Sequence, residues 1–279
     1  MNKLIITVAA TGNVPTKEMN PHLPVTPEEI AETAVRCREA GASLIHVHAR
    51  DVAGKPTLDP EVFARIHRLI SECSDIIVQI STGGRAGMDP EARAAAVRRI
   101  RPEMASLTTG SMNFPDRVYA NPFDVVEYLA EAMKEAGTKP EMEIFELGMI
   151  ANALTLAGKG LTLPPLHFDF VLGNRGSLPA SPKNLLFLSE SLPPDSTWTV
   201  AGIGRWQLPM AVLAIVMGGH VRVGLEDNLY YRKGTLKGTG ELATNEQLVA
   251  RVVRIAAEVG RPIASPDEAR AILGLKRGE

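Results

Sequence analysis

The chain has 279 residues, of which 45% are hydrophobic and 22% are charged, and its formal net charge is −2. This is a globular composition, and the chain is long enough to bury a large core. The near-neutral charge and the lack of a long basic run argue against a nucleic-acid partner. No run of about 18 apolar residues predicts a membrane span.

The first residues and the two cysteines bear on location. Residues 1–8 lack the layout of a signal peptide and pass directly into a strand pattern. Cys37 and Cys73 lie in helix-like stretches without CxxC spacing, which favours a reducing compartment. We therefore expect a cytoplasmic protein.

Strand-like and helix-like stretches alternate along the whole chain. The predicted strands are residues 4–10, 43–49, 76–82, 104–109, 141–147, 166–172, 197–203 and 220–225. The predicted helices are residues 27–41, 60–73, 89–100, 122–137, 149–159, 182–191, 206–218 and 244–260, followed by 266–274. Thr26 before Pro27, with Glu29 three residues after Thr26, is typical of a helix start.

The β-then-α units predict the fold class. Eight units without a break in composition predict an α/β protein, a single (β/α)8 TIM barrel that forms one catalytic domain over residues 1–279. A doubly wound open sheet also uses β-then-α units. The count of eight and the even spacing favour the barrel.

Polar residues collect at the carboxyl ends of the predicted strands, where a barrel carries its working face. In chain order they are Thr11–Asn13, His46, His48, Ser81–Arg85, Ser106, Thr108–Ser111, Glu143, Glu146, Gly173–Gly176, Gly202–Arg205, Arg222 and Glu226–Asn228. Surface solvation alone does not explain this concentration at one end of all eight strands. We infer one site built from many loops.

His46 and His48 alternate with apolar residues in the second predicted strand. Residues two apart on a strand point to the same side, so the two imidazoles can share a metal ion. The alternative is a pair of histidines held by hydrogen bonds at the barrel mouth. The pairing on one face favours the metal.

Glu226 is the best candidate for a third metal ligand, because it ends the last predicted strand. Two imidazoles and one carboxylate leave an open position for a substrate oxygen, as in catalytic sites. This set suits zinc, and it also suits iron or manganese. The alternative for Glu226 is an ion pair with Arg222 that closes the barrel. The other histidines fit poorly, since His22 is in a loop, His67 is mid-helix, and His167 and His220 begin their strands.

Asp227 follows Glu226 and can reach the same mouth. A base beside a cation-bound carbonyl can remove an α-proton while the metal holds the enolate oxygen. Arg222 would add positive charge toward that oxygen. The alternative is that Asp227 caps a loop.

Two glycine motifs suit anionic oxygens. Ser81–Gly84 offers hydroxyls and unhindered N–H groups before a helix. Gly202, Gly204 and Arg205 follow the seventh strand, where barrels often hold phosphate, and we expect them to bind a cofactor there. Each motif alone is weak, because βα turns use glycine anyway.

Longer segments of the chain resemble the β-keto acid cleavage enzymes. The segments that carry the resemblance are Val25–Ile30, Ala40–Arg50, Gln79–Gly84, Pro140–Glu143, Val200–Trp206 and Gly218–Asn228. The resemblance runs over nearly the whole length. It implies a zinc-dependent TIM barrel that condenses a β-keto acid with acetyl-CoA and cleaves the product by a retro-Claisen step. The products are acetoacetate and a new acyl-CoA.

The resemblance also implies roles for particular residues. His46, His48 and Glu226 match the zinc ligands, Asp227 the base, Arg222 the residue that steadies the carbanion, and Glu143 a residue that orients them. Ser81, Gly84 and Ser106 match positions that hold the substrate carboxylate, although the family typically has threonine at the place of Ser106. We expect Thr108, which ends the same strand, to contact substrate as well. The family is usually oligomeric, so a homotetramer is expected.

Two departures from the family pattern bear on the substrate. Val14 stands where members that act on an amino-substituted keto acid carry a glutamate, and an ammonium beside valine is costly to desolvate. We therefore expect a neutral or apolar β-keto acid, with an anionic one second. Gly173–Gly176 replaces a more usual Val-Pro-Gly. Arg175 in that loop either pairs with an anionic tail or is simply solvated.

Two other functions stay open from the sequence. One is a different zinc-dependent barrel enzyme, either a hydrolase or a metal-assisted aldolase or lyase. Barrel hydrolases usually place further histidines at the exit ends of the middle strands, and those positions carry Glu143 and Asp169 here. The other is a ligand-binding barrel without activity, which the combination of ligands, base and arginine disfavours.

Overall fold

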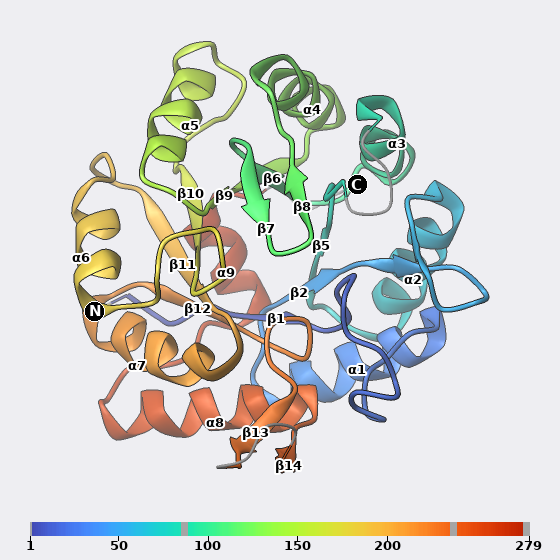
Figure 1. Cartoon of the computed structure of the whole chain (residues 1–279), viewed down its shortest axis with the longest axis vertical. Coiled ribbons are helices and arrows are strands. Elements are labelled where there is room, and N and C mark those ends of the chain that lie inside the picture. The colour runs from blue at the N-terminus through green and yellow to red at the C-terminus, as the bar shows by residue number, and fades with distance from the viewer. Residues whose placement is uncertain (1, 85–88, 235–238, 276–279) are drawn as a thin grey trace.

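Eight parallel strands close into one barrel in this computed structural model, which describes residues 2–84, 89–234 and 239–275. Neighbours in the barrel run in the order β1-β12-β11-β10-β9-β6-β5-β2, so each strand pairs with the barrel strands before and after it in the chain (Figure 1). The barrel strands are β1 (Ile6–Ala9), β2 (Leu44–Val47), β5 (Ile77–Ile80), β6 (Met104–Thr108), β9 (Lys139–Ile144), β10 (His167–Leu172), β11 (Thr197–Gly202) and β12 (His220–Val223). The predicted TIM barrel is confirmed, and the open sheet is excluded because β12 pairs with β1.

The predicted helices form the outer layer (Figure 1). They are α1 (Pro27–Ala40), α2 (Pro60–Cys73), α3 (Pro90–Ile100), α4 (Phe123–Ala136), α5 (Gly148–Gly158), α6 (Pro182–Glu190), α7 (Gln207–Met217) and α8 (Asn245–Glu258), with a 3-10 turn η1 (Gly204–Trp206) before α7. The predicted start of α1 is confirmed as a capping box. The Thr26 hydroxyl accepts a hydrogen bond from the Glu29 N–H at 3.2 Å, and the Glu29 carboxylate accepts one from the Thr26 N–H at 3.1 Å. None of the helices in the described ranges has the length and apolarity to cross a membrane.

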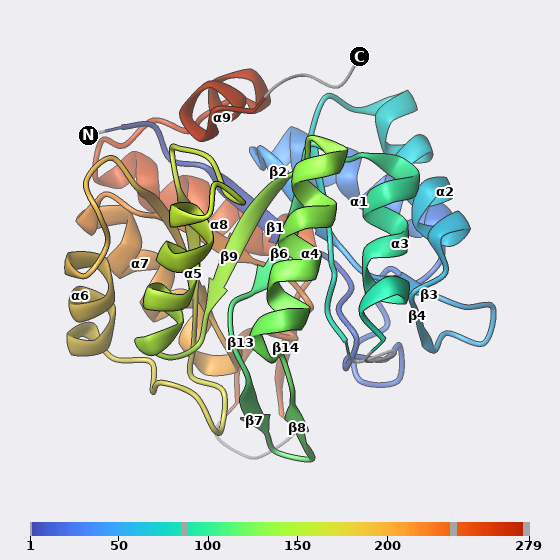
Figure 2. The same cartoon turned by 90° about the horizontal axis from the view of Figure 1, so that it is seen from above.

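The last helix, α9 (Pro266–Leu273), covers the end of the barrel where the strands begin. A small apolar cluster joins it to Ile5, Leu44, Ile77 and Met104 at the strand starts. Figure 2 shows α9 at one end of the barrel and the β7–β8 hairpin projecting from the other. The amino end is therefore plugged, and the open mouth lies at the carboxyl ends of the strands.

Three short antiparallel ribbons surround that mouth and were not predicted. They are β3 (Ala49–Arg50) with β4 (Pro56–Thr57), β7 (Met112–Phe114) with β8 (Arg117–Tyr119), and β13 (Tyr230–Lys233) with β14 (Gly240–Leu242). Each follows a barrel strand in the chain. Strands of two to four residues are too short to give a clear alternation in the sequence. Of these, the β7–β8 ribbon contributes Phe114 and Tyr119 to the lining of the mouth.

Polar side chains occupy the inside of this barrel, where branched apolar residues are usual. Contacts between strands that are not neighbours place them there. The Arg222 Nη1 atom on β12 lies 3.6 Å from the Asp169 carboxylate on β10 and 3.9 Å from the Glu143 carboxylate on β9. The large apolar core lies instead between the strands and the surrounding helices. The barrel thus provides a rigid frame around a charged centre.

Candidate active site

His46, His48 and Glu226 come together at the barrel mouth. The His48 Nε2 atom is 3.3 Å from the Glu226 Oε1 atom, and the His46 Nε2 atom is 3.9 Å from Oε2. One ligand atom from each residue lies within 4.8 Å of the other two. A zinc ion about 2.0–2.2 Å from each ligand atom requires such spacing. Glu226 Oε2 is also buried with no hydrogen-bond partner in the described part of the chain, as suits a metal ligand.

The orientation of His46 is fixed by Gln79, whose part the sequence did not indicate. The Nδ1 atom of His46 lies 2.6 Å from the Gln79 Oε1 atom. Because an amide oxygen only accepts, His46 carries its proton on Nδ1 and turns a lone pair on Nε2 toward Glu226. Burial lowers the pKa of His46 to about 4, against the opposing effect of Glu226. The ring is thus neutral and ready to bind a cation at physiological pH.

Arg222 and Asp227 form a bidentate pair next to this cluster. The guanidinium donates from Nε to Asp227 Oδ2 at 2.9 Å and from Nη2 to Oδ1 at 3.1 Å, and Nη2 also donates to Glu226 Oε1 at 2.9 Å. Burial raises the pKa of Asp227, although Arg222 opposes this. Burial likewise opposes ionisation of Glu226, yet His48 and Arg222 hold its pKa well below the ordinary value. The pKa values of these two neighbouring carboxylates are therefore shifted in opposite directions, and Asp227 is the more basic of the two.

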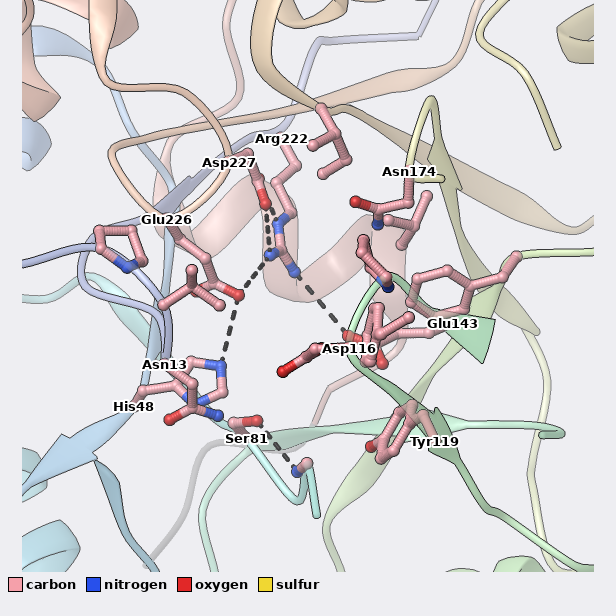
Figure 3. Close-up of a pocket in the computed structure, with 18 residues that line it drawn as sticks. Asn13, His48, Ser81, Asp116, Tyr119, Glu143, Asn174, Arg222, Glu226 and Asp227 are labelled. Atoms are coloured by element: carbon pink, nitrogen blue, oxygen red, sulfur yellow. Dashed lines mark hydrogen bonds and ion pairs between the residues drawn. The ribbon is translucent and has the colours of Figure 1, made fainter. Parts of the chain in front are cut away.

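Glu143 lies on the far side of Arg222, on β9. The Thr108 hydroxyl donates a hydrogen bond to its carboxylate at 2.5 Å. Burial raises the pKa of Glu143, with Arg222 and Thr108 acting in the opposite direction. Figure 3 shows Glu143 across the cavity from Glu226, with Arg222 between them.

A cavity of about 480 Å³ opens onto these groups (Figure 3). Its lining has a polar part and an apolar part. The polar part includes His48, Ser81, Glu143, Arg222, Glu226 and Asp227, with Asn13, Asp116 and Asn174, and the apolar part includes Val14, Pro15, Phe114, Phe145, Val171 and Ile203. The cavity thus offers a charged reaction centre and apolar surface for a substrate side chain.

Of the residues expected to hold a substrate carboxylate, only some line the cavity. Ser81 lines the cavity, and its hydroxyl accepts a hydrogen bond from the Gly83 N–H at 3.1 Å. The Gly84 N–H donates to the Tyr119 hydroxyl at 3.2 Å, a contact that the sequence did not indicate. Ser106 is buried on β6 and does not line the cavity. Thr108 also lies behind the wall, where it supports Glu143.

The second glycine motif lies beside this cavity. Gly204 and Arg205 border a smaller neighbouring cavity that shares Val14, Pro15, Glu226 and Asp227 with the first. Gly202 ends β11 and lines neither cavity, and a Cβ there would lie 2.3 Å from the Trp206 carbonyl oxygen. Close backbone packing therefore accounts for Gly202.

Two histidines, Glu146 and Arg175 lie outside the cavity. His167 and His220 are buried at the amino ends of their strands as expected, with His167 Nε2 3.0 Å from Glu141 and His220 Nδ1 accepting the Ile5 N–H at 3.1 Å. The expectation that Glu146 lies on the fifth strand is wrong, because β9 ends at Ile144 and Glu146 is exposed in the following turn. Arg175 is exposed in the loop after β10.

Comparison with known proteins gives a consistent result over the whole chain. The sequence profile of a family described as beta-keto acid cleavage enzyme matches residues 3–275. The chain is 50% identical over 279 residues to a 3-keto-5-aminohexanoate cleavage enzyme of Fusobacterium nucleatum, with 99% of this chain and 100% of that protein covered. It is 44% identical over 275 residues to a 3-oxoadipate:acetyl-CoA acetyltransferase of Cupriavidus necator, with 97% and 94% covered.

A solved structure supports the fold alone. The apo structure of ObcA superposes with a TM-score of 0.79 at 21% identity, over 91% of this chain and 66% of that one. The profile match and the two relatives concern the sequence itself, and they cover nearly all of it. The chain therefore belongs to the β-keto acid cleavage enzymes, which are acetyl-CoA-dependent acyltransferases.

Proposed function

We propose that this enzyme cleaves a β-keto acid by exchanging its acyl group with acetyl-CoA, using a divalent cation held by His46, His48 and Glu226. The products are acetoacetate and a new acyl-CoA. The observation that carries the proposal is the convergence of the three ligand atoms beside the Asp227–Arg222 pair in one cavity. We propose zinc as the cation, because two imidazoles and one carboxylate are a set that it accepts in catalytic sites.

Asp227 is the proposed base. It removes a proton from the carbon between the ketone and the carboxylate of the substrate, and its raised pKa suits it for this step. Arg222 stabilises the negative charge that results. When bound, the cation supplies Lewis-acid polarisation of the substrate oxygens. Glu143 faces Arg222 from the opposite side and orients it.

The remaining steps exchange the two acyl groups. The substrate carbanion attacks the thioester carbonyl of acetyl-CoA, and the CoA thiolate leaves. The thiolate then attacks the original ketone, and the bond between that carbonyl and the carbanion carbon breaks. Protonation of the released carbanion gives acetoacetate, and the original acyl group leaves as the new acyl-CoA.

Carboxylate and CoA contacts are proposed for the residues of the two glycine motifs. We assign the substrate carboxylate to the Ser81 hydroxyl, with Gly84 and Ser106 supporting that region from behind the wall. We assign a CoA phosphate to Gly204 and Arg205, which border the neighbouring cavity. Arg205 is held over the Trp206 ring, 4.6 Å from its centroid, which limits the loss of side-chain entropy on binding an anion.

We propose a substrate with a neutral or apolar side chain. Val14 lines the cavity with Pro15, Phe114 and Phe145, and its side chain leaves an ammonium without an acidic partner from the β1 loop. Asp116 also lines the cavity, but it forms an ion pair with Arg117 at 3.2 Å. The Fusobacterium relative is named for an amino-substituted keto acid, so the proposal distinguishes this chain from it.

Assembly and location are proposed as well. Residues 1–279 would form one catalytic domain in a homotetramer, supported by exposed apolar side chains on the adjacent helices α6 and α7, namely Leu186, Phe187, Leu208, Val212 and Val216. Light scattering of the purified protein tests this, and a monomer would contradict it. Cys37 and Cys73 are not joined in a disulfide, which supports the cytoplasm.

The function is tested by incubating the purified enzyme with a panel of β-keto acids and acetyl-CoA. Mass spectrometry of the products should show acetoacetate and an acyl-CoA that carries the side chain of the keto acid. Release of a free acid without use of acetyl-CoA would instead indicate a hydrolase. Fastest turnover with an amino-substituted keto acid would contradict the substrate proposal alone.

A further inference from the structure

Asp169 is a buried carboxylate that the proposed reaction does not use. It lies on β10, opposite Glu143 on β9 and Thr199 on β11. Its side chain is 0% exposed, and neither carboxylate oxygen has a hydrogen-bond partner in the described residues. It is not among the residues that line the cavity. Any role of Asp169 in the reaction must therefore act through a neighbour.

Packing does not explain this residue. A buried carboxylate without hydrogen bonds destabilises a fold, and an apolar residue of similar volume often packs better. Burial, with the added effect of Glu141, raises the pKa of Asp169 well above its ordinary value, which shows how poorly the position suits a charge. Barrel interiors usually carry valine, isoleucine or leucine at such positions.

The neighbour is Arg222. Two of its nitrogen atoms are anchored, since Nε and Nη2 donate to Asp227 and Nη2 also donates to Glu226. Nη1 is different, because it is buried without a hydrogen-bond partner in the part of the chain that is described. It faces Asp169 Oδ2 at 3.6 Å and Glu143 Oε1 at 3.9 Å. Figure 3 shows the guanidinium directed from Asp227 toward Glu143 across the cavity.

We infer that Asp169 is a positioning residue, whose carboxyl group holds Nη1 of Arg222 from behind the cavity wall and keeps the guanidinium turned toward the substrate. A guanidinium is planar, so holding Nη1 adds a further restraint on its rotation to those already made at Nε and Nη2. The inference rests on the proposed function for its kinetic consequence. Its structural consequence, a fixed guanidinium, is independent of that function.

The kinetic test compares two replacements of Asp169. Asp169→Leu removes the oxygen atoms while keeping the same branched shape, and Asp169→Asn retains one acceptor oxygen. We expect Asp169→Leu to lower kcat about 100-fold with KM within about threefold, and Asp169→Asn to recover kcat to within about tenfold of the unchanged enzyme. Glu141→Gln is the matched control, because this buried carboxylate pairs with His167 at 3.0 Å, and we expect its kcat within about threefold.

A second measurement does not need turnover. In protein labelled with ¹⁵N-arginine, the Arg222 signals are assigned by their loss in Arg222→Lys. Hindered rotation should give separate Nη1 and Nη2 signals in the unchanged protein, in Asp169→Asn and in Glu141→Gln. In Asp169→Leu the exchange between the two signals should be faster, because one restraint on the guanidinium is removed while its bonds to Asp227 and Glu226 remain.

The outcomes are distinct. An equal loss of kcat in Asp169→Leu and Asp169→Asn, or an exchange rate in a folded Asp169→Leu equal to that of the unchanged protein, would overturn the inference. If Asp169→Leu does not fold, Asp169→Ala is measured in the same way, with faster exchange between the two signals expected and an unchanged rate contradicting the role. If the unchanged enzyme shows no turnover with any β-keto acid, the proposed function fails, and the arginine signals still decide the role of Asp169.

Discussion

The Arg222 guanidinium donates two hydrogen bonds to the Asp227 carboxylate, from Nε to Oδ2 at 2.9 Å and from Nη2 to Oδ1 at 3.1 Å. The same guanidinium donates to Glu226, a proposed metal ligand. Arg222 therefore connects the proposed base, Asp227, to the proposed metal ligand Glu226 by hydrogen bonds. A change in any one of them is expected to affect the others through Arg222.

Asp227→Asn should retain the metal and lose most of the turnover. The amide keeps the shape of the carboxylate but takes up no proton, so we expect kcat to fall about 10²–10⁴-fold. Metal content, measured by atomic emission, should match that of the unchanged enzyme. A kcat near normal would remove Asp227 from the role of base.

His48→Ala should lose the metal and the activity together. The remaining imidazole and carboxylate leave too few ligands, and we expect the affinity for zinc to fall more than about 100-fold. Competition with a chromogenic chelator measures this. His22→Ala is the matched control, because His22 is exposed in a loop, and it should bind zinc normally. Full occupancy in His48→Ala would show that the proposed ligand set is wrong.

Gln79→Leu should weaken zinc binding through His46. The Gln79 amide oxygen, 2.6 Å from Nδ1, holds the ring in the orientation that presents Nε2 to Glu226. Loss of such a partner typically costs about 10–100-fold in metal affinity. The same chelator competition applies, and an unchanged affinity would mean that His46 does not depend on this contact.

Val14→Glu should shift the substrate preference toward amino-substituted keto acids. A carboxylate on the cavity wall would pair with the ammonium, and we expect the ratio of kcat/KM for amino over apolar substrates to rise about tenfold or more. In Val14→Gln the side chain has the shape of glutamate without its charge, so this variant should not shift the substrate preference. If both variants behave alike, the side chain at position 14 does not select for charge.

Acid should destabilise the metal-free protein partly through His220. Burial lowers the pKa of His220 to about 3, while in the unfolded chain it is near 6.5. Between these values the unfolded chain binds a proton that the folded protein does not, so stability is lost as the pH falls below about 6.5. His220→Asn keeps an acceptor for the Ile5 N–H and lacks this titration.

Urea unfolding of both proteins in the presence of a chelator checks this. From pH 7 to pH 5, the free energy of unfolding should fall by about 2 kcal/mol more in the unchanged protein than in His220→Asn. Parallel pH dependences would show that His220 takes up its proton equally in both states. The buried carboxylates contribute equally to the free energy of unfolding of both proteins, so their contribution cancels in the difference.

Much of the site could be predicted because its parts are local or follow from the fold. His46 and His48 share a side because strand residues alternate, which is a property of a few neighbouring residues. Glu226 is far away in the sequence, yet the closure of the barrel brings β12 next to β1, where the Glu226 N–H donates to the Ala9 carbonyl at 3.1 Å. The eight β-then-α units were therefore enough to predict that these three candidate metal ligands lie together.

Contacts between side chains on different strands could not be predicted from the sequence in this way. Asp169 lies near Arg222 across the barrel, while Gln79 lies beside His46 on the neighbouring strand β5, and both distances depend on the register of the strands. The Gly84 N–H was expected to face an anion, but it is bonded to Tyr119 on a ribbon too short to predict. Periodicity indicates on which face of a strand a side chain lies. It does not indicate which side chain of another segment it contacts.

The sequence by itself thus determined the barrel, the face that carries the chemistry and the residues that can hold a cation, since these depend on alternation along single strands and on strand order. Only the tertiary structure decided which carboxylate meets which nitrogen atom of Arg222 and which residues line the cavity. The reason is physical: burial and cross-barrel distances set the pKa and orientation of each group, and both arise only when the eight strands close.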